Sequence, residues 1–495
     1  MYIIACSLIA ICVIFLLLID TIKPTRYPPG PTWVPIVGNF LEFRKKLSRL
    51  NYHHLVYEEF SERFGNVVGL KMGRNLVVAV FGADAVKEVL TREEFDGRPD
   101  GFFFRLRTFG KRLGIVFSDG QFWQKQRKFS LQHLRSFGFG RREMEEKIVD
   151  ETKDLIALFR KQCSEPIWMH TAFDVSVLNV LWAMMAGERF NVNDERLLKL
   201  LQIIHDAFRL TDMSGGMLNQ LPFLRFVAPD VCGYNKIVSI LTRMWEFLEE
   251  TIDQHKRTLC GSHARDLIDA FLQKMNVKND NDASFTDDQL MSLCLDLFMA
   301  GSETTSNTLG YSVIYMLQYP EVQKRVQLEM DEIVGRNRWP TLQDRLNLKY
   351  TEAVLMEIQR RANIPPLGIA HRTVRSAELF GYRIPEGTMV LTSLYSVHMD
   401  ADFWRDPLAF RPERFLDPDG NLTFNEKYFA PFGYGKRRCL GESLAKANYF
   451  LFFTALSHNF YLEDAPDSPR PQFDGYDGVT ISPKPFKAKL VPRTD

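Results

Sequence analysis

The feature that most constrains this chain is a short string around a single cysteine, Cys439, which directly precedes a strongly apolar helical stretch. The string reads Phe432-Gly433-Tyr434-Gly435-Lys436-Arg437-Arg438-Cys439-Leu440-Gly441. Its glycines permit backbone angles that other residues resist, and they let a flat ligand approach closely. The flanking cations and the N-terminus of the following helix each lower the pKa of a thiol. The string therefore predicts a thiolate that ligates a metal, and the alternative is a buried structural cysteine after a glycine turn.

The spacing of this string resembles the haem-binding motif of the cytochrome P450 family, with matching residues at Phe432, Gly435, Arg437, Cys439 and Gly441. The resemblance implies haem b as the cofactor, with the Cys439 thiolate as the axial ligand of its iron. It also implies that Arg437 pairs with a haem propionate and that Phe432 packs beside the thiolate. The implied fold class is mainly α with small β-sheets, the cytochrome P450 fold, preceded by one N-terminal transmembrane helix.

A second feature is a long apolar helical pattern. Thr286 and Gln289 form a candidate capping box at its start, and Pro320 stops it. Its middle, residues 300–305, contains glycine, serine and threonine, which weaken a helix by up to ~1 kcal/mol each. The same stretch contains an acid that is costly to bury. The residues alone leave two explanations open, a close helix crossing and a functional site.

The family resemblance gives the string Ala300-Gly301-Ser302-Glu303-Thr304 a functional meaning. It is similar to the distal-helix motif, where the helix opens locally over the haem. This similarity implies that Thr304 and Glu303 are catalytic and supply protons for dioxygen activation, because a hydroxyl beside a carboxylate is a minimal proton relay. The pairing favours a monooxygenase over a haem-thiolate enzyme that isomerises peroxides.

Further motifs extend the resemblance along the chain. Trp123 and Arg127 share one face of a predicted helix, and the resemblance implies that they bind haem, Arg127 through a propionate. Arg98 and His371 occupy places where related microsomal enzymes also contact the propionates. A glutamate and two arginines resemble a structural triad that locks the fold around the haem, namely Glu357, Arg360 and Arg414. Taken singly, such residues are explained as well by packing or by solvated surface pairs.

The N-terminus predicts a membrane anchor. Residues 2–19 are apolar apart from Ser7, and at about 1.5 Å per residue they span roughly 27 Å, close to the ~30 Å core of a bilayer. A cleaved signal peptide, the alternative, would have a basic segment before its core and small residues at a cleavage site. Lys23 and Arg26 follow the run, so the positive-inside rule places the body in the cytosol. We expect an anchor at residues 1–21, a proline-rich linker at 22–38 and a haem-thiolate catalytic domain at 39–495.

Composition narrows the partners. A net charge of +1 argues against a nucleic-acid binder. The seven cysteines are scattered without CxxC spacing, which argues against a disulfide framework or zinc site and fits a reducing compartment. No glycine-rich string has the strand–GxGxxG–helix context of a nucleotide site, so electrons must come from another protein. The resemblance to microsomal members implies an NADPH-dependent diflavin reductase and the endoplasmic reticulum membrane. Lys436 and Arg438 are either part of its docking surface or simply solvated.

The substrate side is rich in apolar residues. Residues 101–109, Phe298, Met299 and residues 364–369 predict an apolar wall for a lipophilic substrate, although plain core packing explains the phenylalanines equally well. Strings within residues 95–140 resemble insect juvenile-hormone epoxidases. That resemblance implies epoxidation of methyl farnesoate or farnesoic acid to juvenile hormone or its acid. Sister enzymes with similar motifs hydroxylate steroids or xenobiotics, and this reaction is the alternative. The intact motifs argue against a non-catalytic membrane scaffold.

Overall fold

The structure is a computed structural model that describes residues 2–210, 214–261, 263–277 and 282–493. Its architecture is mainly α with small β-sheets, as predicted. The α-helices are α1 (Tyr2–Ile19), α2 (Phe40–Leu50), α3 (His53–Phe64), α4 (Ala83–Thr91), α5 (Phe102–Leu106), α6 (Gly120–Ser136), α7 (Arg142–Gln162), α8 (Asp174–Met185), α9 (Glu195–Leu210), α10 (Gly216–Gln220), α11 (Leu224–Val227), α12 (Tyr234–Thr258), α13 (Leu267–Met275), α14 (Asp287–Gln318), α15 (Pro320–Ile333), α16 (Lys349–Ala362), α17 (Leu394–His398), α18 (Ala401–Trp404) and α19 (Glu442–Asn459). The 3-10 turns are η1 (Glu93–Phe95), η2 (Asp344–Leu346), η3 (Pro412–Phe415) and η4 (Gly435–Arg437).

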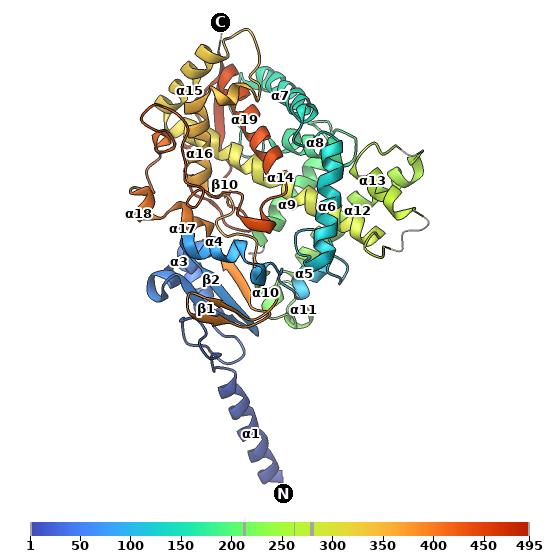
Figure 1. Cartoon of the computed structure of the whole chain (residues 1–495), viewed down its shortest axis with the longest axis vertical. Helices are drawn as coiled ribbons and strands as arrows, with labels where there is room; N and C mark the ends of the chain where they lie inside the picture. The colour runs from blue at the N-terminus through green and yellow to red at the C-terminus, as the bar shows by residue number, and fades with distance from the viewer. Residues whose placement is uncertain (1, 211–213, 262, 278–281, 494–495) are drawn as a thin grey trace.

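The strands are short. They are β1 (Val67–Met72), β2 (Asn75–Val80), β3 (Ile167–Trp168), β4 (His371–Arg372), β5 (Ala377–Leu379), β6 (Tyr382–Ile384), β7 (Met389–Thr392), β8 (Phe460–Asp464), β9 (Gly475–Tyr476), β10 (Ser482–Pro483) and β11 (Lys487–Pro492). Strands β1 and β2 lie at the end of the body from which α1 projects, whereas β10 lies among the helices (Figure 1). The largest sheet has the order β1-β2-β7-β4, in which β1 and β2 form an antiparallel hairpin and β7 joins β2 in parallel. The pairing through β7 connects the N-terminal hairpin to the chain near residue 390.

The core is organised around α14, the long helix that the sequence predicts. Its N-cap is Thr286, whose side chain accepts a hydrogen bond from the backbone N–H of Gln289 at 3.2 Å. Most of its residues are buried, and it packs against α8, α12, α16 and α19. At Gly301, a Cβ would lie 2.4 Å from a Leu181 side-chain carbon on α8. The close helix crossing is therefore part of the explanation for the glycine in the middle of α14.

Helix α1 projects away from the body, as Figure 1 shows. It has a mean hydropathy of 3.1 and no buried residue, and it is the one described helix long and apolar enough to span a membrane. The segment that follows it is packed rather than free. Tyr27 is buried and donates from its hydroxyl to the Val77 carbonyl of β2 at 3.0 Å, and the Gly69 N–H donates to the Pro29 carbonyl at 2.7 Å. These contacts fix the segment after the C-terminal end of α1 against the largest sheet.

Candidate active site

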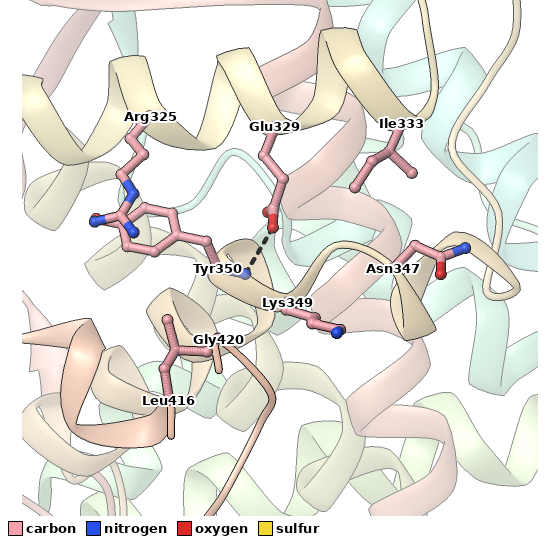
Figure 2. Close-up of a pocket in the computed structure, with 8 residues that line it drawn as sticks. All are labelled: Arg325, Glu329, Ile333, Asn347, Lys349, Tyr350, Leu416 and Gly420. Carbon is pink, nitrogen blue, oxygen red and sulfur yellow. Dashed lines mark hydrogen bonds between the residues drawn. The ribbon is translucent and has the colours of Figure 1, made fainter. Parts of the chain in front are cut away.

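One internal cavity of about 450 Å³ lies between α14 and the cysteine loop. Its wall contains every residue of the predicted site except Glu303, namely Arg98, Trp123, Arg127, Thr304, His371, Phe432, Arg437 and Cys439. These residues come from segments more than 300 positions apart in the sequence. A second hollow of about 580 Å³ lies on the surface between α15 and α16, where Arg325 lies over the Tyr350 ring (Figure 2). No residue of the predicted site lines that hollow, so the internal cavity is the candidate active site.

The cysteine loop is held by its backbone. The Cys439 N–H donates to the Phe432 carbonyl at 3.0 Å, which closes the loop on itself just before α19. Gly435 is required for this path because its φ is +67° and a Cβ there would lie 2.1 Å from the Leu90 carbonyl oxygen of α4. The loop therefore holds the backbones of Phe432 and Cys439 together.

The protonation of the thiol differs from the sequence-based expectation. The exposed surface of Cys439 faces the cavity, inside the protein. Burial raises the pKa of the thiol and outweighs the Gly441 N–H and the cations Arg127 and Arg438, which lower it. The expected lowering of the pKa by the flanking cations and the helix N-terminus is therefore wrong for the unliganded thiol. A coordinated metal ion changes this balance, because it deprotonates a coordinating thiol.

Two guanidinium groups lie over the indole ring of Trp123. The Arg437 guanidinium carbon is 3.7 Å from the ring centroid, and that of Arg127 is 5.6 Å away. Arg437 donates to the Asp96 carbonyl at 3.0 and 2.8 Å, whereas its buried Nη1 has no hydrogen-bond partner. Arg127 donates to the Arg438 carbonyl at 2.8 Å. Trp123 therefore orients both cations toward one side of the cavity.

Arg98 and His371 complete the polar part of the wall. Arg98 is buried and donates to the carbonyls of Val116, Ile369 and Ala370 at 3.1, 2.8 and 2.9 Å. Nδ1 of His371 lies 2.7 Å from the Phe95 carbonyl, and this acceptor assigns the proton to Nδ1. Burial and the nearby charge of Arg98 hold the pKa of His371 well below its ordinary value. His371 is therefore neutral, while burial and the nearby charge of Arg437 hold the pKa of Arg98 well below its ordinary value.

The charge of this wall provides a test for the implied haem. Among the described residues, Arg98, Arg127 and Arg437 form no ion pair, because their partners are backbone carbonyls. Burial lowers the pKa of Arg437 to about 10, and Arg127 contributes to the same lowering. Unpaired buried cations are costly, so the wall suits a ligand with more than one carboxylate. Haem has two propionates and an iron that accepts a thiolate, and the residues present fit it.

Thr304 and Glu303 point to different places. Thr304 lines the cavity, but its hydroxyl donates back to the Ala300 carbonyl at 3.0 Å within an uninterrupted α14. Glu303 is fully buried and does not line the cavity. Its Oε1 accepts hydrogen bonds from Asn307 and from the Thr480 hydroxyl, each at 3.1 Å. The local opening of the helix and the direct approach of Glu303 to the cavity, both expected from the resemblance, are absent from α14 in this structure.

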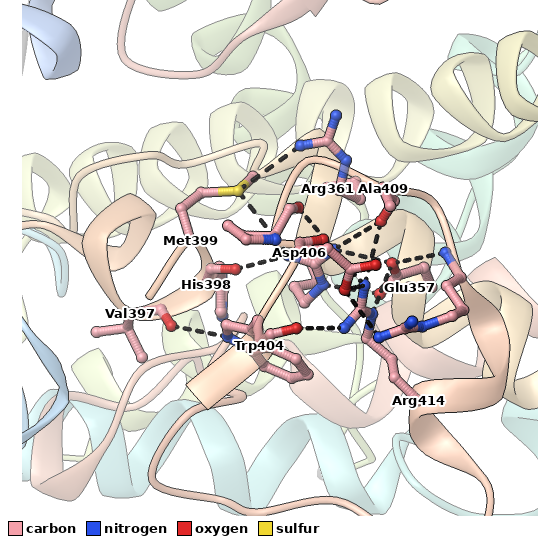
Figure 3. Close-up of polar contacts among 12 residues, drawn as sticks. Glu357, Arg361, Val397, His398, Met399, Trp404, Asp406, Ala409 and Arg414 are labelled. Atoms are coloured by element: carbon pink, nitrogen blue, oxygen red, sulfur yellow. Dashed lines mark hydrogen bonds and ion pairs between the residues drawn. The ribbon is translucent and has the colours of Figure 1, made fainter. Parts of the chain in front are cut away.

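The structural triad is present as the resemblance implies. Arg360 donates two hydrogen bonds to Glu357 at 2.7 and 2.8 Å, and Arg414 donates to the same carboxylate at 3.0 Å. Glu357 and Arg360 have no exposed surface. Figure 3 shows that Arg414 also faces Asp406 and the Ala409 carbonyl. The triad joins α16 to η3 and lies outside the cavity, which agrees with a structural role.

The sequence reasoning missed several wall residues. Asp296 on α14 accepts from the N–H groups of Ile115 and Val116 at 2.7 and 2.9 Å and pairs with Arg107 at 2.9 Å. An acid within an apolar helix was the available signal. The prediction that Phe298 lines the wall is wrong, because its ring packs on Trp182 and Phe247 away from the cavity. Met299, the other predicted wall residue of α14, does line the cavity.

Comparisons with known proteins agree with this site. The family model described as Cytochrome P450 matches residues 28–490. A farnesoate epoxidase from Bombyx mori is 40% identical over 489 residues, which covers 98% of each chain. Cytochrome P450 2J5 from Mus musculus is 36% identical and covers 98% of this chain and 96% of its own. A vitamin D(3) 25-hydroxylase from Sus scrofa is also 36% identical and covers 97% of each chain.

Proposed function

Because the chain belongs to the cytochrome P450 family and is a monooxygenase, we propose that its reaction is the epoxidation of methyl farnesoate or farnesoic acid to juvenile hormone or its acid. The observation that carries this proposal is the full-length similarity, at 40% identity, to a farnesoate epoxidase. The cavity supports it, since most side chains on the substrate side are apolar, including Phe103, Leu181, Leu297 and Ile364. Such a wall suits an acyclic lipophilic chain held by shape.

The residues divide into roles around the cofactor. Cys439 would hold the haem iron, and Trp123, Arg98, Arg127, Arg437 and His371 would hold its acidic edge. When bound, haem supplies the chemistry that activates dioxygen for insertion into the substrate. The chain itself orients the substrate against the apolar wall and places the Thr304 hydroxyl at the cavity surface. The glycine loop and Phe432 exclude water from the thiolate side.

Electrons would come from NADPH through a diflavin reductase, as for related microsomal enzymes. Lys436 and Arg438 lie on the exposed surface of the cysteine loop, where an acidic partner could approach the thiolate side. Each already pairs with an acid, Lys436 with Glu93 and Arg438 with Glu442. A reductase surface would therefore compete with these intramolecular pairs, and the competition predicts docking that weakens with ionic strength.

Helix α1 would anchor the protein in the endoplasmic reticulum membrane. Its length, its hydropathy and its full exposure support a single membrane span. Lys23 and Arg26 follow the span directly and would remain on the cytosolic face.

The proposal is tested in two steps. The full-length protein, reduced and exposed to CO, should show the red-shifted absorption band of a thiolate-ligated haem, and Cys439→Ser should lose that band. Methyl farnesoate and farnesoic acid should then shift the haem spin state, and with reductase and NADPH at least one of them should give the epoxide. If neither compound shifts the spin state, the substrate assignment is wrong while the family assignment stands.

A second candidate reaction is hydroxylation of a steroid-like or xenobiotic substrate. It is favoured by the similarity, at 36% identity, to a vitamin D(3) 25-hydroxylase. Spin-state titration with secosteroids and drug-like amines distinguishes it from the epoxidase reaction. A peroxide isomerase, the remaining alternative, would be insensitive to Thr304→Ala, whereas a monooxygenase with this variant should release more peroxide per NADPH.

A further inference from the structure

A buried charged chain lies behind the cavity wall and is not used by the residues described so far. Nε2 of His205 on α9 lies 2.8 Å from Oδ2 of Asp174 on α8. Nδ1 of His205 lies 3.8 Å from Oε1 of Glu303 on α14. Each of these side chains has at most 5% of its surface exposed. Two carboxylates and one imidazole thus share one buried compartment between α8, α9 and α14.

The chain reaches the cavity through one hydroxyl. Thr480, in the turn between β9 and β10, lines the cavity and donates its hydroxyl hydrogen to Oε1 of Glu303 at 3.1 Å. Thr304 also lines the cavity, but its hydroxyl donates to the Ala300 carbonyl. Thr480 is therefore the cavity hydroxyl that touches the acid in this structure, in place of the neighbouring threonine on α14.

The members of this chain keep spare hydrogen-bonding positions. Asp174 Oδ1, His205 Nδ1 and Glu303 Oε2 are buried atoms without a hydrogen-bond partner. The 3.8 Å between His205 Nδ1 and Glu303 Oε1 allows an ion pair but is too long for a hydrogen bond. A small rotation of either side chain would bring the two atoms into hydrogen-bonding distance, so that a proton can pass from His205 to Glu303. The other ionisable groups around this compartment are His170, before α8, and Arg209 on α9. His170 is only partly buried and leads outward from the compartment.

We propose that protons enter the cavity through Thr480, supplied by Glu303, and that the His205 imidazolium both reprotonates Glu303 and, together with Asp174, holds it against Thr480. The proposal rests on the monooxygenase function, whose reaction consumes two protons and two electrons for each dioxygen and releases one water. In each transfer the Thr480 hydroxyl gives its proton to the cavity and takes one from Glu303. Glu303 takes its replacement from the His205 imidazolium, which solvent reprotonates.

Thr480 is tested with two substitutions of opposite character. Thr480→Val keeps the shape and removes the hydroxyl, whereas Thr480→Ser keeps the hydroxyl and loses a methyl group. We expect Thr480→Val to lower the amount of epoxide formed per NADPH several-fold and to raise peroxide release. We expect Thr480→Ser to resemble the wild type. The matched control is Thr454→Val, a buried threonine of α19 outside the cavity, which should leave coupling unchanged. The proposal is overturned if Thr480→Val forms as much epoxide per NADPH as the wild type, or if Thr480→Val and Thr480→Ser lose the same amount.

The charge coupling has a readout that does not depend on turnover. His205→Gln leaves the two carboxylates without their cation and should lower the midpoint of thermal unfolding, measured by circular dichroism on the full-length protein. Adding Glu303→Gln should restore part of the loss, because one of the two charges is then absent. His255→Gln breaks a similar buried pair with Asp266, and Glu303→Gln should not relieve it. If the change in unfolding midpoint of the double variant His205→Gln/Glu303→Gln equals the sum of the two single changes, His205 does not hold Glu303 in place.

The same variants have a defined pH dependence. Burial opposes the charge of His205, but the attraction of Asp174 and Glu303 outweighs it and raises its pKa to about 10. Since the folded pKa lies above the ordinary value of about 6.5, the stabilisation is complete below pH 6.5 and is lost as pH rises toward 10. The difference in unfolding midpoint between wild type and His205→Gln should therefore shrink over that range. If the wild type forms no epoxide with any substrate, the proposed function fails, whereas these unfolding measurements still test the charged chain.

Discussion

Two groups of buried arginines differ in how their charge is balanced. Arg360 and Arg414 share the carboxylate of Glu357, and backbone carbonyls and the Asp406 carboxylate accept from their other N–H groups (Figure 3). The second group consists of Arg98, Arg127 and Arg437, which have backbone carbonyls and an indole ring around them but no carboxylate. The first group is complete as the chain folds. The second group lacks negative charge that only a ligand can supply, and this difference identifies which cluster is functional.

The largest effect should come from breaking the balanced group. Glu357→Ala leaves the buried Arg360 without a counter-charge and leaves Arg414 with only the partly exposed Asp406, which costs about 3–5 kcal/mol. We expect a strongly lowered unfolding midpoint and little folded protein at growth temperature, measured by circular dichroism. The matched control is Glu413→Ala, which removes a partly exposed glutamate of η3 that pairs with Arg325. Its unfolding midpoint should be close to that of the wild type. Equal losses for the two variants would mean that burial does not set the strength of the triad.

The unbalanced group should respond in the opposite way. Arg437→Ala removes a charge-assisted contact to haem worth about 1.5–3 kcal/mol, so haem should dissociate roughly 10–100-fold faster to an acceptor protein. The same variant should raise the unfolding midpoint of the haem-free protein, since it removes one of three repelling cations. A lower midpoint for the haem-free variant would show that Arg437 is structural like Arg360.

Arg127→Ala should have a smaller effect of the same kind. Arg127 is half-buried and lies farther from the Trp123 ring than Arg437 does. A net contribution of about 1 kcal/mol corresponds to roughly 5-fold faster haem loss. Stopped-flow measurement of haem transfer provides the ranking of the two variants. An effect larger than that of Arg437→Ala would reverse the order that burial predicts.

The smallest effect is expected for an exposed cation of the same loop. Lys436 pairs with Glu93 at the surface, and solvent screens such pairs strongly. Lys436→Ala should leave the unfolding midpoint and the rate of haem loss unchanged within error. It should lower the NADPH-supported rate at low ionic strength if the reductase docks on this loop, and a stability loss instead would show that this surface pair is structural.

The sequence predicts the features whose determinants are local. The cysteine loop and the Thr286 cap of α14 follow from residue types at fixed spacing, and the structure contains both. The triad is long-range, but two short motifs mark it. Such features are predictable because one backbone segment contains the information for each.

The direction of single side chains is less predictable. Glu303 lies on α14, and its charged neighbour His205 lies on α9, where it also pairs with Asp174 of α8. These ion pairs depend on how the three helices cross, which the local sequence does not determine. Thr480 is more than 170 positions away in the sequence from its partner Glu303. Phe298 turns into the aromatic core because Trp182 and Phe247 leave room there. The pKa of Cys439 likewise depends on burial, which no local motif encodes.

The unmatched arginines around Trp123 also have a cellular consequence. A ligand that binds only the folded chain stabilises it by mass action. Newly made copies of this protein that have not received haem carry the full repulsion of Arg98, Arg127 and Arg437 and unfold more often. Quality-control proteases remove such copies first. The abundance of the protein should therefore follow the haem supply of the cell, independently of the rate at which its message is translated.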